Sequence, residues 1–86
     1  MAFRTKQVAD FLDIRSSQVQ KLLASGRLKG HKHIDGKHWL VEKEDLAYFI
    51  VTEDYYKKKF AKIIASDSSH RNDFYILLRE VNKLIS

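Results

Sequence analysis

The stretch SSQVQKLLASGRLKGHKHIDGKHWLV, residues 16–41, predicts a short helix followed by a β-hairpin. Val19, Leu22 and Leu23 fall at i, i+3 and i+4, which is one apolar stripe at helical spacing. A helix of about nine residues is unstable alone, so we expect neighbouring elements to cover this stripe.

The sequence also predicts the two ends and the outer face of this helix. Ser16 is the expected N-cap, and Gly26 is the expected C′ residue. The C′ position commonly has a left-handed backbone conformation, which costs glycine little because it has no Cβ. The outer face carries small polar or cationic side chains of the kind that reach phosphates and base edges in a major groove, namely Ser17, Gln18, Gln20 and Lys21.

The hairpin is indicated by Asp35 and Gly36, a two-residue turn signal between two extended runs. Such a turn places Lys32 opposite Trp39 and puts Trp39 and Val41 on the inward face. A longer loop would change this assignment of faces.

Positive charge is concentrated in the same stretch. Residues 15–41 contain six Lys or Arg and one acidic residue, so their net charge of +5 equals that of the whole chain. A basic helix next to a basic ribbon is typical of a protein with a polyanionic partner. Charge alone does not distinguish DNA from RNA or a membrane surface.

Composition excludes several classes of protein. With 86 residues, 44% hydrophobic and 31% charged, the chain is expected to form one soluble globular domain. It has no Cys, which excludes a disulfide scaffold and any thiolate metal site. No apolar run has the length of a membrane span and no signal-peptide core is present, so we expect a cytoplasmic protein.

A first helix is predicted over residues 6–12, with Thr5 as its N-cap. Val8, Phe11 and Leu12 form its apolar stripe, and Val8 leaves a capping box from Thr5 incomplete. Asp13 tolerates the left-handed region at its end. Two short helices joined by about three residues form a helix-turn-helix.

The C-terminal part of the chain is predicted to be helical. We expect a third helix over residues 44–51 and a fourth from the N-cap Thr52 to residue 65, with one continuous helix over residues 44–65 as the alternative. A polar connector over residues 66–72 precedes a last helix.

The last helix has a wide apolar stripe. We expect it to pack partly against Phe60 and Ile64 and partly against a second copy of the chain; alternatively, all of it folds back onto the domain. The stripe, and thus the predicted oligomer interface, consists of Phe74, Leu77, Leu78, Val81, Leu84 and Ile85.

Several spaced segments together resemble the excisionase/MerR-like winged-helix family. They are TKQVA (residues 5–9), LDI (12–14), SSQVQKLLASGRL (16–28), GKHWLV (36–41) and EDL (44–46). The resemblance covers about residues 5–50. It implies a winged helix-turn-helix whose second helix lies in the major groove and whose hairpin wing follows the backbone or minor groove.

Members of this family are small phage, plasmid or bacterial regulators and recombination accessory factors, and many act as dimers or cooperative arrays. This chain departs from the family in three ways. The wing is a residue or two longer, Leu40 stands where Arg is frequent, and the long coiled coil and effector domain of MerR-type proteins are absent. We therefore expect no small-molecule ligand.

The predicted fold is mainly α with a small β-hairpin. It comprises a winged helix-turn-helix DNA-binding region over residues 1–51 and a C-terminal helical hairpin over residues 52–86, within one compact domain. The predicted DNA-binding residues lie on the second helix and the wing: Arg15, Ser16, Ser17, Gln18, Gln20, Lys21, Arg27, Lys29, His31, Lys32, His33, Lys37 and His38.

Other chemistry has little support. Three wing histidines could share a face and bind zinc, but only Asp35 lies near them as a further ligand, so we expect no metal or other cofactor. The chain has no Ser/His/Asp or Cys/His signature and no glycine-rich phosphate loop, so we expect no enzyme.

The sequence therefore predicts a sequence-specific double-stranded DNA-binding protein, either a transcriptional regulator or an excisionase-like factor, that acts as a homodimer or cooperative assembly. It would work in the bacterial cytoplasm or nucleoid, or in the host cytoplasm if phage-encoded. One alternative is an adaptor that binds an acidic protein. Another is RNA or single-strand binding, which usually exposes aromatic rings for stacking.

Overall fold

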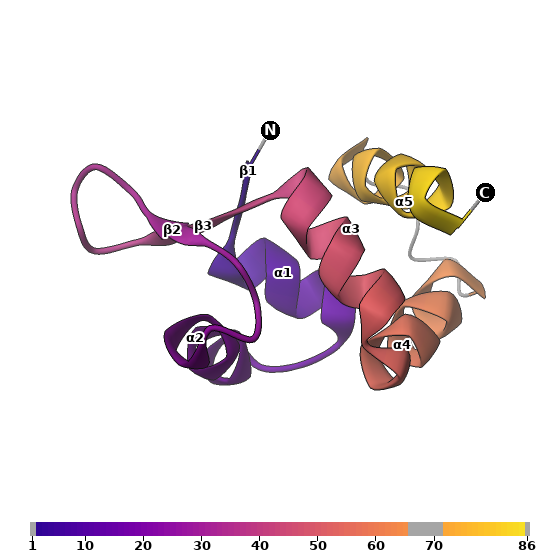
Figure 1. The fold of residues 1–86 in the computed structure, drawn as a ribbon, viewed down its shortest axis with the longest axis horizontal. Helices are drawn as coiled ribbons and strands as arrows, with labels where there is room; N and C mark the ends of the chain where they lie inside the picture. The colour runs from indigo at the N-terminus through magenta and orange to yellow at the C-terminus, as the bar shows by residue number, and fades with distance from the viewer. Residues whose placement is uncertain (1, 66–71, 86) are drawn as a thin grey trace.

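In a computed structural model, which describes residues 2–65 and 72–85, five helices pack with a three-stranded antiparallel sheet that lies against α1 and α3 at one side of the molecule (Figure 1). The mainly α fold with a small hairpin is thus confirmed. Residues 66–71 of the predicted connector lie outside the described residues. The elements are β1 (Ala2–Arg4), α1 (Thr5–Leu12), α2 (Ser16–Ser25), β2 (His31–Lys32), β3 (Trp39–Glu42), α3 (Lys43–Thr52), α4 (Asp54–Ala65) and α5 (Asn72–Ile85).

The start of α2 lies one residue earlier than predicted. Arg15 is the N-cap and Ser16 is the first helical residue, so the prediction of Ser16 as the cap is wrong. The reason is a side chain three residues further on, because Gln18 Oε1 accepts a hydrogen bond from the Arg15 backbone N–H at 3.2 Å. This is the Gln half of a capping box.

The start of α1 repeats this arrangement. Arg4 is the N-cap in place of Thr5, and Gln7 Oε1 accepts from the Arg4 backbone N–H at 2.9 Å. At the other end, Asp13 ends α1 in the left-handed region with φ 55°, as predicted. The predicted Gly26 stop of α2 is confirmed as well, with φ 83°.

The sheet has the order β1-β3-β2, and its first strand was not predicted. Phe3 in β1 pairs with Val41 in β3, and both side chains are fully buried. Three residues are too few to show an alternating pattern. This strand therefore depends on its pairing with the edge of β3, which the local sequence does not reveal.

The hairpin keeps the predicted register but not the predicted turn. Lys32 pairs with Trp39, as expected. However, Gly36 N–H donates to the His33 carbonyl at 2.7 Å and His33 N–H donates to the His38 carbonyl at 2.6 Å, which closes a loop over residues 34–37. A two-residue type I′ turn needs positive φ at both central residues, and Asp35 does not have it.

The break between α3 and α4 lies at Glu53, where the backbone is extended (φ −107°, ψ 102°). The alternative of one continuous helix is therefore wrong. Thr52 is also not the N-cap of α4, because it is the last residue of α3 and its hydroxyl donates to the Tyr48 carbonyl at 2.8 Å.

The C-terminal helices share one hydrophobic core with the N-terminal part, and α5 lies mainly against α3 (Figure 1). The rings of Phe60 and Phe74 stack at 5.4 Å between centroids.

Phe74, Leu77 and Val81 are buried in this core. They are therefore not available to a second copy, which corrects half of the predicted interface. Within that stripe, Leu84 and Ile85 remain about half exposed and Leu78 is partly buried. The division of the chain between residues 51 and 52 stays a prediction.

Gly30 lies where the chain enters the wing, against the back of α2. A Cβ added to Gly30 would lie 2.5 Å from Leu23 Cδ2 and 3.0 Å from the backbone carbonyl oxygen of Leu40. The side chain of Leu23 is itself buried, so it has little room to move. The close approach of the wing to α2 therefore requires a residue without a side chain.

We expect Gly30→Ala to lower the free energy of unfolding by about 1–3 kcal/mol, because the added methyl overpacks the contact between α2 and β3. Urea unfolding followed by circular dichroism measures this. The neighbouring exposed Lys29 provides the control, since Lys29→Ala should change stability by less than about 0.5 kcal/mol. Equal stability of both variants would contradict the overpacking.

Candidate nucleic-acid interface

The helix α2 and the wing lie at one end of the molecule, with α5 at the other (Figure 1). We define the wing as residues 31–42, comprising β2, β3 and the loop that joins them. Val19, Leu22 and Leu23 of α2 are buried in the core. This burial aims the remaining side chains of α2 outward on the same end as the wing.

The exposed face of α2 is polar, cationic and without an acidic residue. Every predicted contact on it is exposed, namely Arg15, Ser16, Ser17, Gln18, Gln20 and Lys21. One of them has a second role, because Gln18 Oε1 caps the helix, whereas its NH₂ group has no part in the cap.

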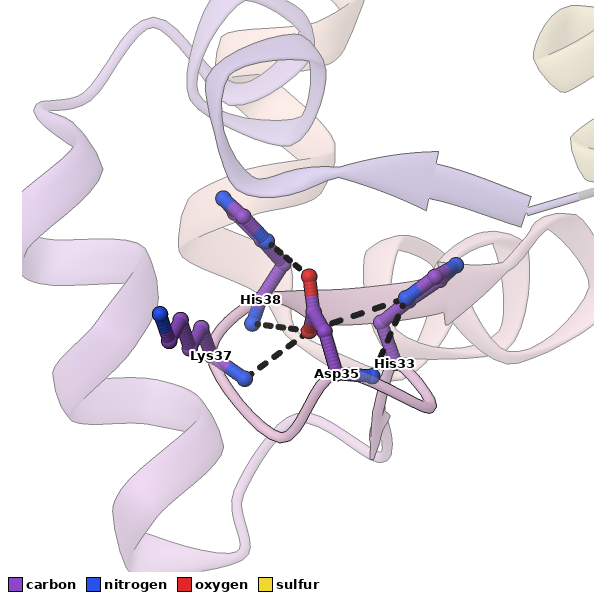
Figure 2. A network of polar contacts seen from close by, with 4 residues as sticks. All are labelled: His33, Asp35, Lys37 and His38. Carbon is purple, nitrogen blue, oxygen red and sulfur yellow. Dashed lines mark hydrogen bonds and ion pairs between the residues drawn. The ribbon is translucent and has the colours of Figure 1, made fainter.

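The wing loop is organised by one carboxylate (Figure 2). Asp35 Oδ1 accepts from the backbone N–H groups of Lys37 at 2.9 Å and His38 at 3.3 Å. Asp35 Oδ2 lies 2.8 Å from His38 Nδ1, and His33 Nδ1 lies 3.6 Å from Oδ1 on the other side. We call this set the Asp35 clamp. It holds both arms of the loop in one geometry.

The clamp also affects the ionisation of Asp35. The hydrogen bond from Lys37 N–H, followed by the side-chain contact with His38, lowers the pKa of the Asp35 carboxyl well below its ordinary value. Asp35 is therefore ionised at neutral pH. Its negative charge stabilises the loop from within, whereas the cationic side chains around it remain exposed.

The wing histidines do not form a metal site in this geometry. Within residues 2–65 and 72–85, no group of three or more His, Cys, Asp and Glu is arranged to hold a metal ion. His33 and His38 direct Nδ1 to Asp35, and His31 lies in β2 opposite Leu40.

Lys32 and Arg27 are held by contacts within the chain. Lys32 Nζ lies 4.6 Å from the centroid of the Trp39 ring, a cation–π contact that keeps the ammonium on the wing surface. Arg27 forms an ion pair with Glu53 at 3.3 Å, so its guanidinium is directed to the junction of α3 and α4. Lys29 and Lys37 are exposed.

Another basic surface, formed by lysines of α4, lies beside the turn between α1 and α2. Lys59 Nζ donates to the Asp13 carbonyl at 3.2 Å. Asp13 shares a shallow hollow of about 380 Å³ with Tyr55, Lys58, Lys59 and Lys62. No local pattern in the sequence reveals that α4 packs beside this turn.

The Asp35 clamp generates a prediction about loop order. Asp35→Ala removes the carboxylate oxygen that accepts from the backbone N–H groups of Lys37 and His38. We therefore expect the amides of residues 36–38 to become mobile while the melting temperature, set by the core, changes little. Asp35→Asn retains an acceptor oxygen but loses the charge, so its loop should be intermediate. Heteronuclear ¹⁵N relaxation measures the order, and equal rigidity of Asp35→Ala and wild type would contradict the clamp.

The same clamp gives a pH dependence. Because the pKa of Asp35 is lowered on folding, its contribution to stability is complete above its ordinary value of 3.8. The contribution declines below that value and is lost as the pH falls through the lowered pKa. In the folded loop Asp35 stays ionised until the pH reaches the lowered pKa. On the same relaxation measurement, the wild-type loop should therefore stay ordered from pH 7 down to about pH 3.8 and lose order only at a still lower pH.

Comparison with known proteins bears on the N-terminal region. A family model described as a helix-turn-helix domain matches residues 2–51, more than half of the chain. No curated protein and no solved structure matches the chain. The match agrees with the geometry, since α1, α2 and the wing all fall within it. The chain therefore belongs to the excisionase-like helix-turn-helix domain family, a family of DNA-binding domains.

Proposed function

We propose that this chain is a sequence-specific double-stranded DNA-binding protein that acts as a small transcriptional regulator or recombination accessory factor, not as an enzyme. The observation that carries the proposal is the shared position of two surfaces. The polar face of α2 and the basic wing lie at one end of the molecule, and the segment that forms them holds the net charge of +5.

In this proposal α2 enters the major groove. The groove is about 12 Å wide and admits one α-helix, whose diameter with side chains is about 10–12 Å. Ser17 and Gln20 are placed to read base edges, while Arg15 and Lys21 bind phosphates. Gln18 would contribute through its NH₂ group, since its oxygen caps the helix.

The wing contributes affinity that depends little on sequence. Lys32 and Lys37 stand at its two arms, and Lys29 precedes it. Each phosphate that these side chains neutralise releases a counterion, so binding should weaken steeply with salt. The exposed lysines of α4 are placed to reach flanking phosphates next to the turn between α1 and α2.

The two alternatives differ in what they require of the surface. An adaptor for an acidic protein would use the same charges without base readout. Single-strand or RNA binding needs exposed rings on the binding face, but the wing's one aromatic residue, Trp39, is partly buried and packs on the core beneath Lys32. A gel shift with random duplex, single strand and RNA separates the three classes.

Where this protein works is also part of the proposal. None of the helices in the described residues is long and apolar enough to cross a membrane. A DNA-binding role places the chain with the nucleoid of a bacterium, or in the host cytoplasm if the gene is carried by a phage.

Two variants, Gln20→Ala and Lys32→Ala, test the roles assigned to these side chains. The binding of each variant is measured on two duplexes: one that the wild-type chain selects from a random library, and one of random sequence. Gln20→Ala should lose about 1–3 kcal/mol of discrimination at one base position and bind random DNA normally. Lys32→Ala should weaken both duplexes alike and reduce the salt slope by about one phosphate contact.

Arg79→Ala on α5 is the control that removes an exposed positive charge at the opposite end, and its binding should equal that of wild type. Fluorescence anisotropy at several salt concentrations provides all of these values. If Gln20→Ala and Lys32→Ala weaken both duplexes equally, the division between readout and phosphate binding is wrong.

We also propose that the chain forms a homodimer or a cooperative assembly on DNA, through the part of the α5 stripe that remains exposed, Leu84 and Ile85 with the edge of Leu78. Sedimentation equilibrium should show self-association that Leu84→Glu abolishes without lowering the melting temperature. A wild-type chain that stays monomeric at every concentration, with and without duplex, would remove this idea.

A further inference from the structure

Ile34 stands at the tip of the wing loop with 97% of its side chain exposed. Among the described residues it is the most exposed large hydrophobic side chain, and it has no place in the hydrophobic core. A single exposed apolar residue on a flat surface needs no explanation. This one is instead at the end of a loop that projects from the body on the same side as α2 (Figure 1).

The loop holds Ile34 in that position. The hydrogen bond from Gly36 N–H to the His33 carbonyl at 2.7 Å makes Ile34 and Asp35 the two central residues of the turn. The Asp35 clamp then ties the turn to His38 and Lys37. Figure 2 shows the Asp35 side chain turned toward His33 and His38. The exposed Ile34 is therefore the side chain that the tip leaves for a partner.

The surroundings of Ile34 are cationic on both sides. Lys32 precedes it and Lys37 follows it, and both side chains are exposed. The minor groove is about 6 Å wide, too narrow for a helix but wide enough for one side chain at a loop tip. Its two walls are phosphate strands, which match basic groups on both arms of the loop.

We propose that Ile34 is an apolar wedge that enters the minor groove next to the major groove occupied by α2. Buried there against sugars and base edges, it contributes affinity without hydrogen-bond readout and favours steps that unstack easily. The wedge excludes pairs that carry an amino group on the minor-groove edge, because that group occupies the floor of the groove. This inference rests on the proposed duplex binding.

The test uses a duplex that changes only the minor groove. One mixed-sequence 30-base-pair duplex carries ordinary adenine, and a second carries 2,6-diaminopurine in its place, which adds a minor-groove amino group and leaves the major-groove pattern unchanged. Wild type should bind the ordinary duplex about tenfold more tightly than the substituted one, and Ile34→Thr should lose that difference by weakening on the ordinary duplex alone.

Ile34→Thr keeps the branched shape and removes the apolar character, and Ile34→Leu should restore most of the affinity. Since Ile34 contributes nothing to the core, both variants should melt at the wild-type temperature. The wedge is overturned if Ile34→Thr binds both duplexes as wild type does, or weakens equally on both. If wild type binds neither duplex, duplex binding itself has failed.

Discussion

The close contact between Gly30 and Leu23 sets the geometry of the whole candidate interface. Leu23 belongs to the buried stripe of α2, and Gly30 opens the wing, so this contact fixes how far the wing stands from the helix. The Leu28 N–H donates to the Leu22 carbonyl at 3.1 Å and the Leu28 side chain is buried, which fixes the path between the two. The polar face of α2 and the wing are thereby held in one relative position by one small region of core.

An acidic residue in the middle of a basic loop is at first sight unfavourable for binding a polyanion. Asp35 removes one unit of positive charge, but its oxygens satisfy two backbone N–H groups and one histidine. Binding by a disordered loop requires that its conformational entropy be lost at the moment of association. A clamped loop has already lost this conformational entropy before it binds. The smaller entropy loss on association offsets the unit of positive charge that Asp35 removes.

The C-terminal half supports this end of the molecule from behind. The helix α5 lies on α3, α3 follows directly from β3, and the ion pair of Glu53 with Arg27 joins the junction of α3 and α4 to the segment after α2. Lys59 ties α4 to the turn between α1 and α2 through the Asp13 carbonyl. Truncated at residue 51, the chain would expose core residues such as Leu46 and Ile50, since the helix that contacts α3 most would be missing.

The sequence by itself determined the order and type of the main helices, the stops at Asp13 and Gly26, the wing register of Lys32 with Trp39, and the basic polar character of the α2 and wing surfaces. These features depend on the spacing of apolar residues and on conformational preferences within short segments, so a short stretch of sequence is enough to predict them. The tertiary structure alone decided that Phe3 completes the sheet through β1, that α5 buries Phe74, Leu77 and Val81 in its own chain, and that Arg27 pairs with Glu53. Each of these contacts joins segments far apart in the chain, and no local sequence pattern specifies which distant segments pack together.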